Sequence, residues 1–214
     1  MALPGLCGHR LMANYLAIAA VAKTLMRLIE DQCPRDEFTS TPTFQLYQTH
    51  DFGTALVTEG FSLMLWRVTV NSARNQAPRR GPDGVLRRPA LPVDLHFMLT
   101  PWAGEAERQL RLMGWAMRFV EDNACITANI LNHSLTRRER PVFNPDESVE
   151  LFCDPPGLAD YLGLWDKYRT RWQTSINYVA RMVMIESELT MRDEALVRTR
   201  DMRYGTEALE ESTP

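Results

Sequence analysis

The chain has 214 residues, of which 45% are hydrophobic and 24% are charged, so it is long enough for one substantial core. Its net charge of -3 at pH 7 excludes the overall basic field that would drive non-specific binding to nucleic acid. The four cysteines form no C-x-x-C pair, no histidines stand at ligand spacing, and no apolar run is long enough to cross a membrane. We therefore expect reduced, mostly buried thiols and no zinc site, disulfide framework or membrane span.

An amphipathic helix is predicted near the amino terminus, from about Met12 to Asp31, and Pro34 follows its end. Its apolar residues keep helical spacing and are Tyr15, Leu16, Ala19, Ala22, Leu25, Met26 and Ile29. The sequence "AVA" resembles the end of a secretory signal, but the helical spacing continues through Lys23 and Arg27, which favours the helix. Residues 1–11 lack this periodicity, so we predict a loose extension there, ahead of a domain from residue 12 to 187.

A short strand and a long β-hairpin are predicted next. The short strand is "TFQLYQT", Thr43 to Thr49. In "GFSLMLWRVTVN", Gly60 to Asn71, apolar residues occupy both registers, as in a strand that is covered on both faces or bulged midway. In Pro92 to Thr100, apolar residues alternate with polar ones, which predicts a strand with one buried face. We expect these two long strands to pair antiparallel.

An arginine-rich loop, Arg74 to Arg88, forms the predicted tip of that hairpin. It has one aspartate and five arginines, a net charge of +4, and the arginines are Arg74, Arg79, Arg80, Arg87 and Arg88. A solvated tip is one interpretation, because the Pro and Gly content keeps the loop out of the sheet. A basic loop can also grip phosphate, but stacking aromatics and a groove-entering helix are missing from it. We favour a protein partner with an acidic surface and predict the five arginines as its contact residues.

Two helices and two strands are predicted in the second half. The first helix runs from Gly104 to about Asp122, with inward residues Ala106, Leu110, Met113, Met117 and Val120. A short apolar piece, Ile126 to Leu131, precedes the strand "SVELFCD". The helix "GLADYLGLWDKY" is expected to pack Leu158, Tyr161, Leu162 and Trp165, and "TSINYVARMVMIES" reads as a long, largely buried strand.

This order of elements predicts an α+β domain in which amphipathic helices flank a mostly antiparallel sheet with a long hairpin. The apolar members of the strongest periodic segments make up the predicted core, which contains Leu65, Leu95, Phe97, Met113, Met117, Trp165, Tyr178 and Val183.

Residues 188–214 are predicted to form a strand and an acidic tail. From Glu186 to Pro214 the sequence has eight acids and four arginines, a net charge of -4. The stretch "EALVRTRDMRY" keeps some β character, and it is a candidate to pair along a sheet edge in this chain or in a neighbour's. Thr206 to Pro214 is expected to be frayed.

No catalytic constellation is recognised in the sequence. Asp51-Phe52-Gly53 matches the kinase metal-binding tripeptide, but the other kinase motifs are missing. His96 shares a strand face with Asp94, yet no nucleophile or oxyanion donor accompanies it, so a hydrogen-bonded histidine at the sheet surface is favoured over a catalytic pair. A small-molecule enzyme and a nucleic-acid-binding module that uses Arg74 to Arg88 are the alternatives, and no cofactor or metal is assigned.

Six hydrophobic blocks stand in a familiar order: "YLAIAAVAKTLMRLIE", "LWRVTVNSARN", "PVDLHFMLTPW", "LRLMGWAMRFVEDN", "SVELFCDPPGLADYLGLWDKY" and "TSINYVARMVMIE". Together they resemble the cap proteins, or tail terminators, of phage-tail-like contractile injection systems. They are similar to the amino-terminal domain of the antifeeding-prophage and virulence-cassette caps. The resemblance spans about Met12 to Glu186 and is most specific in Leu91 to Thr100 and Glu105 to Asn123.

The resemblance implies a structural role and a tail-terminator-like fold. Members of that family form a sixfold ring at the distal end of the inner tube and sheath, where they stop polymerisation. The implied partners are further copies of this chain, the tube protein and the sheath protein, with no membrane or nucleic acid. The implied location is the cytoplasm during assembly and then a phage-tail-like particle, retained or released. Because a cyclic ring uses heterologous contacts, the +4 loop and the -4 carboxyl-terminal segment are candidates for complementary surfaces of neighbouring copies.

Overall fold

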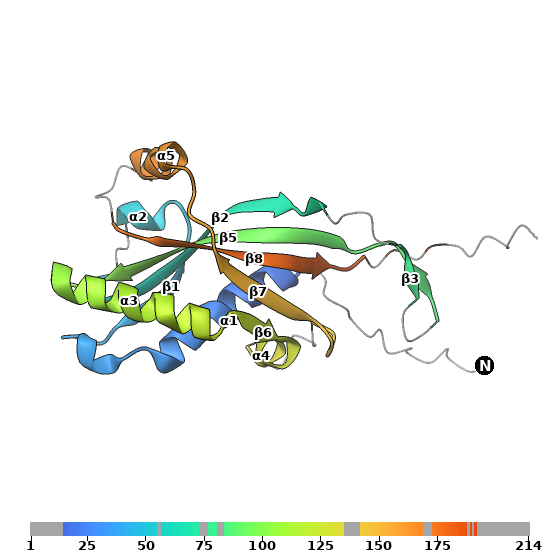
Figure 1. Ribbon diagram of the computed structural model, residues 1–214, viewed down its shortest axis with the longest axis horizontal. Helices are drawn as coiled ribbons and strands as arrows, with labels where there is room; N and C mark the ends of the chain where they lie inside the picture. The colour runs from blue at the N-terminus through green and yellow to red at the C-terminus, as the bar shows by residue number, and fades with distance from the viewer. Residues whose placement is uncertain are drawn as a thin grey trace, which may run out of the picture.

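The computed structural model describes residues 15–54, 57–72, 77–80, 84–134, 142–168, 173–187, 189 and 191. In these residues a six-stranded sheet has the order β1-β2-β5-β8-β7-β6 (Figure 1). Its strands are β1 Thr43–Tyr47, β2 Gly60–Val70, β5 Leu91–Trp102, β6 Cys125–Thr127, β7 Ser148–Cys153 and β8 Ile176–Ile185. A separate two-stranded sheet consists of β3 Arg79–Arg80 and β4 Leu86–Arg87. The helices are α1 Ala17–Gln32, α2 Asp51–Thr54, α3 Ala106–Asp122, α4 Ala128–His133 and α5 Leu158–Tyr168, with a 3-10 turn η1 at Arg35–Glu37.

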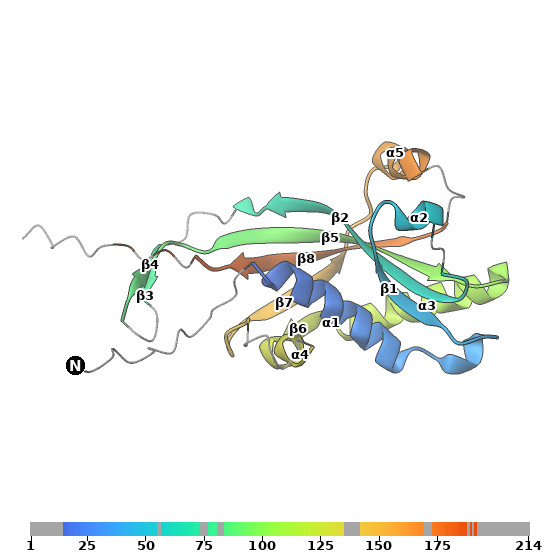
Figure 2. The same ribbon diagram turned by 180° about the vertical axis from the view of Figure 1, so that it is seen from behind.

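The sheet separates two hydrophobic cores, because helices cover both of its faces. On one face, α1, α3 and α4 pack against inward residues of β5 and β8 such as Leu95, Phe97 and Val183. On the other face, α2 and α5 cover a smaller cluster that includes Met98 and Trp165. Figure 2 shows α1 crossing the first face of the sheet, with α5 and α2 on the opposite side. The predicted α+β class and the mostly antiparallel sheet are confirmed.

The central hairpin of β2 and β5 is confirmed, including its irregularity. The two strands pair antiparallel from Gly60 opposite Trp102 to Val70 opposite Val93, and the register shifts between Leu65 and Arg67. A shift of this kind is a β-bulge, which explains why apolar residues of β2 occupy one register before Trp66 and the other after it. β8 joins the other side of β5, also antiparallel.

β1 pairs parallel with β2, a pairing that the sequence did not predict. The connection returns through α2, and the Val57 N–H donates to the Tyr47 hydroxyl at 2.7 Å, which holds the connection against the sheet. β2 then begins at Gly60, whose φ is +129°, and a Cβ there would lie 2.0 Å from the Thr43 carbonyl oxygen. Only glycine fits this position, because both the backbone conformation and the close approach exclude a side chain.

The first helix begins at Ala17, and the predicted residues 12–14 lie outside the described residues. Tyr15 and Ala19, which were assigned to the inward face, are exposed. The other predicted residues are confirmed, because Ala22, Leu25, Met26 and Ile29 are buried and Leu16 is partly buried. The buried face also contains Ala17, Ala20, Val21 and Thr24. These small residues let the helix lie close to the sheet.

The inward face of α3 was predicted mostly wrongly, because of its five predicted residues only Val120 is buried and Ala106 is exposed. Leu110 and Met117 are 62% and 47% exposed, and Met113 is only partly buried. The buried residues are Leu112, Ala116, Phe119 and Val120. The predicted residues and the buried residues form two neighbouring stripes along α3. The stripe that contains Phe119 packs against the sheet, and the stripe that contains Met117 is exposed.

The predicted core is otherwise largely confirmed. Leu95, Phe97, Trp165, Tyr178 and Val183 are buried. Leu65 and Met113 are partly buried against the larger cluster, and only Met117 was wrong. In α5, Trp165 is buried and Tyr161 partly buried, whereas Leu158 and Leu162, which were also expected to pack, are exposed.

Candidate assembly interface

One end of the sheet extends past the helices of the second face and carries the arginine hairpin. We define the projecting end as Arg67–Val70 of β2, Leu91–Asp94 of β5, Met182–Ile185 of β8, the arginine hairpin with β3 and β4 (residues 79–80 and 84–88), and residues Leu189 and Met191. Figure 1 shows these strands running beyond α2 and α5 toward β3, at the opposite end of the molecule from α5. The predicted tip of the hairpin is therefore a projection, as expected.

The tip contains a small two-stranded sheet, β3 and β4, although the sequence predicted a loop there. Arg79 pairs with Arg87 and Arg80 pairs with Leu86, and Gly84 in the turn has φ +73°. The Arg80 guanidinium donates from Nη1 to the Gly84 carbonyl oxygen at 3.0 Å.

The structure places the five predicted contact arginines unevenly. Arg80 and Arg88 are exposed, whereas Arg87 is half-buried. Arg79 is described by its backbone alone, and Arg74 lies outside the described residues. Two of the five side chains are therefore presented to solvent in the part of the tip that the structure describes.

The chain that follows β8 lies against the arginine hairpin of the same molecule. The Met191 N–H donates to the Leu86 carbonyl oxygen at 2.8 Å, and the Arg88 N–H donates to the Leu189 carbonyl oxygen at 3.2 Å. These bonds continue the antiparallel sense of β5 and β8, which pair up to Leu91 opposite Ile185. The start of the acidic carboxyl-terminal segment thus contacts the basic tip within one chain.

Exposed apolar side chains gather on the projecting end. Val68 and Val70 are 45% and 53% exposed. The other exposed apolar residues there are Val85, Leu91, Leu189 and Met191. Apolar side chains interspersed with arginine are typical of protein–protein interfaces, in which Arg is enriched and Lys is depleted. Sequence reasoning singled out the arginines and missed these apolar neighbours, although the alternation of Val68 and Val70 after the bulge was visible.

Asp94 braces the base of the projecting end. Asn71 Nδ2 donates to both of its carboxylate oxygens, at 2.9 and 2.8 Å, and the Met182 N–H donates to Oδ1 at 2.9 Å. Met182 has φ +56°, an uncommon conformation for a residue with a side chain, and it lies where the register of β5 and β8 shifts. The carboxylate therefore stabilises a bulge in β8.

His96 and Asp94 do not form a catalytic pair. His96 Nδ1 lies 3.2 Å from Asp154 Oδ2, and its Nε2 lies 3.2 Å from Thr69 Oγ1. This is the hydrogen-bonded histidine at a sheet surface that the sequence favoured. A surface hollow of about 360 Å³ is lined by Ser148, Glu150, Arg181 and Met182, and the Met182 N–H donates to Asp94.

No group of three potential metal ligands occurs in the part of the chain that the structure describes, and no helix among these residues is long and apolar enough to span a membrane.

Of the described cysteines, only Cys33 is buried, so the expectation of mostly buried thiols was wrong for Cys125 and Cys153. Burial raises the pKa of the Cys33 thiol to about 12, and burial also raises the pKa of Cys153. Both thiols therefore stay protonated near neutral pH and are poor nucleophiles.

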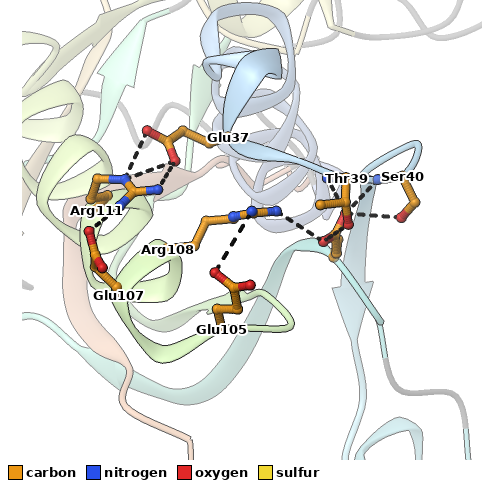
Figure 3. Close-up of polar contacts among 8 residues, drawn as sticks. Glu37, Thr39, Ser40, Glu105, Glu107, Arg108 and Arg111 are labelled. Atoms are coloured by element: carbon orange, nitrogen blue, oxygen red, sulfur yellow. Dashed lines mark hydrogen bonds and ion pairs between the residues drawn. The ribbon is translucent and has the colours of Figure 1, made fainter.

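A polar cluster fixes the opposite end of the sheet (Figure 3). The Glu59 carboxylate is 6% exposed and accepts hydrogen bonds from the N–H and hydroxyl groups of Thr39 and Ser40, at 2.6 to 3.0 Å. These bonds, led by the Thr39 hydroxyl, lower the pKa of Glu59 to about 2. Arg108 lies 3.8 Å from Glu59 and 3.9 Å from Glu105, so the cluster ties the start of α3 to the turn that precedes β2.

A second contact joins α3 to η1 beside that cluster. The Arg111 guanidinium lies 3.0 Å from Glu37 and 2.7 Å from Glu107, and its hydrogen bonds to Glu37 raise its pKa. Figure 3 shows both arginines pointing from α3 toward the segment after α1. These contacts fix the body of the domain and lie away from the projecting end.

Helices on both faces of a mostly antiparallel sheet, with one end of the sheet extended as a hairpin, define the class as an α+β domain. The chain belongs to the family described as the Pvc16 N-terminal domain, whose model matches residues 20–199. This confirms the resemblance found in the sequence. No curated protein matches the chain.

Two solved structures share the fold at low sequence identity. One is the sheath/tube terminator of PVC, an extracellular contractile injection system, in its extended state, with 15% identity and a TM-score of 0.55 over 91% of this chain and 65% of that chain. The other is the tube-terminating cap of the anti-feeding prophage, with 14% identity and a TM-score of 0.51 over 87% of this chain and 60% of that chain. The chain thus spans less than two thirds of the length of these two proteins.

Proposed function

We propose that the chain is a structural cap that terminates the tube and sheath of a contractile injection system. Its membership of the Pvc16 N-terminal domain family over residues 20–199 carries the proposal. The two similar structures are a sheath/tube terminator and a tube-terminating cap, which supports the same role. We infer a non-enzymatic role, which the separate engagement of His96 and Asp94 supports.

The cap acts as a ring of identical copies, six by the family resemblance, with the tube and sheath proteins as further partners. A closed ring requires two different, complementary surfaces on each copy. The projecting end carries exposed arginines beside exposed valines, which supports its use as one of these surfaces. The chain assembles in the cytoplasm and becomes part of the particle.

The arginines of the tip dock the cap on an acidic surface. Arg80 and Arg88 are exposed there, and the tip extends beyond the helices of the second face, where a neighbouring subunit can reach it. Exposed ion pairs contribute only about 0 to 1 kcal/mol each, so the arginines set the register of docking, and the apolar neighbours contribute more of the affinity.

Polymerisation in the presence of the purified chain tests the role. Tube and sheath proteins are assembled with and without the chain, and particle lengths are measured by negative-stain electron microscopy. The proposal expects the chain to be seen at one end of particles that stop growing. Particles that grow equally long with the chain, and carry no density at their ends, would contradict it.

A further inference from the structure

The outer side of β2 is bare along its second half. β1 pairs with β2 only from Gly60 to Met64. From Arg67 to Val70, β2 pairs with β5 on one side, and no strand among the described residues lies on the other side. Among the described residues, the sheet therefore has an open edge at the base of the projecting end.

The alternation of hydrogen bonds shows which backbone groups face this edge. The Asn71 N–H donates to the Pro92 carbonyl oxygen at 3.0 Å, so Asn71 points its backbone groups toward β5. In an antiparallel pair this direction alternates along the strand, so Thr69 also points toward β5, whereas Val68 and Val70 point outward. The edge thus offers the N–H and C=O groups of Val68 and Val70 to an added strand.

The side chains at this edge favour an added strand. Val68, Thr69 and Val70 are β-branched and have high strand propensity, and both valines are exposed. Natural proteins protect open edges with charges, prolines or short strands. In this stretch only Arg67 and the bulge before it serve that purpose, so the edge is well suited to accept a strand.

We propose that the carboxyl-terminal segment of a second copy adds to this edge as a strand. This inference rests on the proposed function, because it names the contact between neighbouring copies of the ring. β2 and β8 flank β5 on opposite sides, so the chain leaves through Leu189 and Met191 on the side away from the bare edge. In a head-to-tail ring, the segment of one copy therefore faces the bare edge of the next.

Length and charge support this occupant. Residues 192–204 follow Met191 and, at about 3.3 Å per extended residue, span about 40 Å, which is enough to reach a neighbour. Residues 192–214 have six acids and four arginines, a net charge of -2, with three of the acids after residue 204, and the exposed arginines of the receiving end are Arg67, Arg80 and Arg88. The stretch "EALVRTRDMRY" supplies valine, leucine, threonine and tyrosine for pairing.

Photo-crosslinking tests the contact in the full chain. The photoreactive residue p-benzoylphenylalanine replaces Val68, and isotope-labelled and unlabelled chains are mixed and assembled at tube ends before irradiation. Mass spectrometry then identifies the cross-linked peptides. We expect peptides from residues 192–214 joined to the probe, including pairs that combine a labelled and an unlabelled chain. Cross-links confined to a single chain, or to other peptides, overturn the inference. The same probe at Met117 of α3, which is 47% exposed against 45% for Val68, is the matched control and should give no such pairs.

Val70→Pro separates strand addition from simple proximity. Proline removes the outward N–H of Val70 and leaves the bonds to β5 intact, so the chain folds normally. The yield of mixed-label cross-links from position 68 should fall at least about fivefold, because one backbone hydrogen bond of the contact is lost. Val70→Thr keeps the N–H and should leave the yield unchanged. An equal yield from the proline variant overturns strand addition. Binding of the unmodified chain to tube ends, measured in the same preparations, tests the proposed function separately.

Discussion

The body and the projecting end use the same strands in different ways. In the body, helices cover both faces of β5 and β8, and Phe97, Leu99 and Ala180 have no exposed surface. In the projecting end, the same strands carry exposed Leu91 and lie beside exposed Val68 and Val70. Burial in the body stabilises the fold, whereas exposed apolar side chains and an open edge cost solubility unless a partner covers them. Under the proposed function, the buried residues of the body serve folding, and the exposed residues of the projecting end serve assembly.

Phe97→Ala, in the body, should cause the largest loss of stability. Phe97 is fully buried between Leu65 of β2 and Tyr178 of β8, so the substitution should lower the free energy of unfolding by about 3 to 5 kcal/mol. Val70→Ala, in the projecting end, is the control and should cost less than about 1 kcal/mol. Urea unfolding monitored by circular dichroism measures both. Similar costs for the two variants would show that the division into body and projecting end is wrong.

Gly60→Ala should have the next largest effect. The φ of +129° and the Thr43 carbonyl oxygen, 2.0 Å from the position of a Cβ, should together cost at least about 2 kcal/mol. Gly84→Ala is the matched control, because Gly84 also has positive φ but has no atom within 4 Å of that position, so it should cost about 1 to 2 kcal/mol. Thermal melting of both variants makes the comparison, and an equal loss would refute the close approach of β1.

Glu59→Gln should reveal a pH-dependent contribution of the body. The pKa of Glu59 is lowered from 4.5 to about 2, so its stabilising effect is present above about pH 4.5 and is lost as the pH falls through about 2. The gap in melting temperature between the native chain and the variant should therefore be largest near neutral pH and shrink toward pH 2. Glu105→Gln, at an exposed acid of the same cluster, serves as the control. A gap that stays constant over this range would rule out the lowered pKa.

Replacement of Arg79, Arg80, Arg87 and Arg88 together by Glu should have the smallest effect on stability. The tip lies outside both hydrophobic clusters, so the melting temperature should change little and the free energy of unfolding by less than about 1 kcal/mol. Circular dichroism with thermal melting of the purified variant tests this. An unfolded variant would make the tip part of the fold.

The strands of the body were predictable because their side-chain periodicity depends on local sequence. β2, β5 and β8 were all predicted as strands, and β2 was expected to pair antiparallel with β5, since alternation over ten residues or so is a strong signal. The bulge in β2 was one of two alternatives, and the partner of β8 was not predicted. The parallel pairing of β1 was not predictable, because nothing local specifies which edge a short strand joins. The face of α3 was misjudged because two neighbouring stripes are apolar, and packing against the sheet selects the one with Phe119 over the one with Met117.

The candidate interface was predictable only in part. The arginines of the tip were predicted from the local composition. The contact of Leu189 and Met191 with the segment at β4 joins residues about a hundred positions apart, so no local sequence pattern could predict it. The cluster around Glu59 was also missed, because Thr39 and Ser40 precede it by about twenty residues in an ordinary turn. Long-range polar contacts of this kind leave no periodic signal in the sequence.

The length of particles in cells tests the central claim most directly. Cells that lack the chain are complemented with the native chain, with the variant in which Arg79, Arg80, Arg87 and Arg88 are all Glu, or with a control in which all four are Lys. The Glu variant places like charges against an acidic partner, at a cost that can reach several kcal/mol, whereas the Lys control keeps the charge. Electron microscopy should show particles of normal length with the native chain, particles of irregular length with the Glu variant, and an intermediate or normal distribution with the Lys control. Particles of normal length with a folded Glu variant would contradict the docking role of the projecting end.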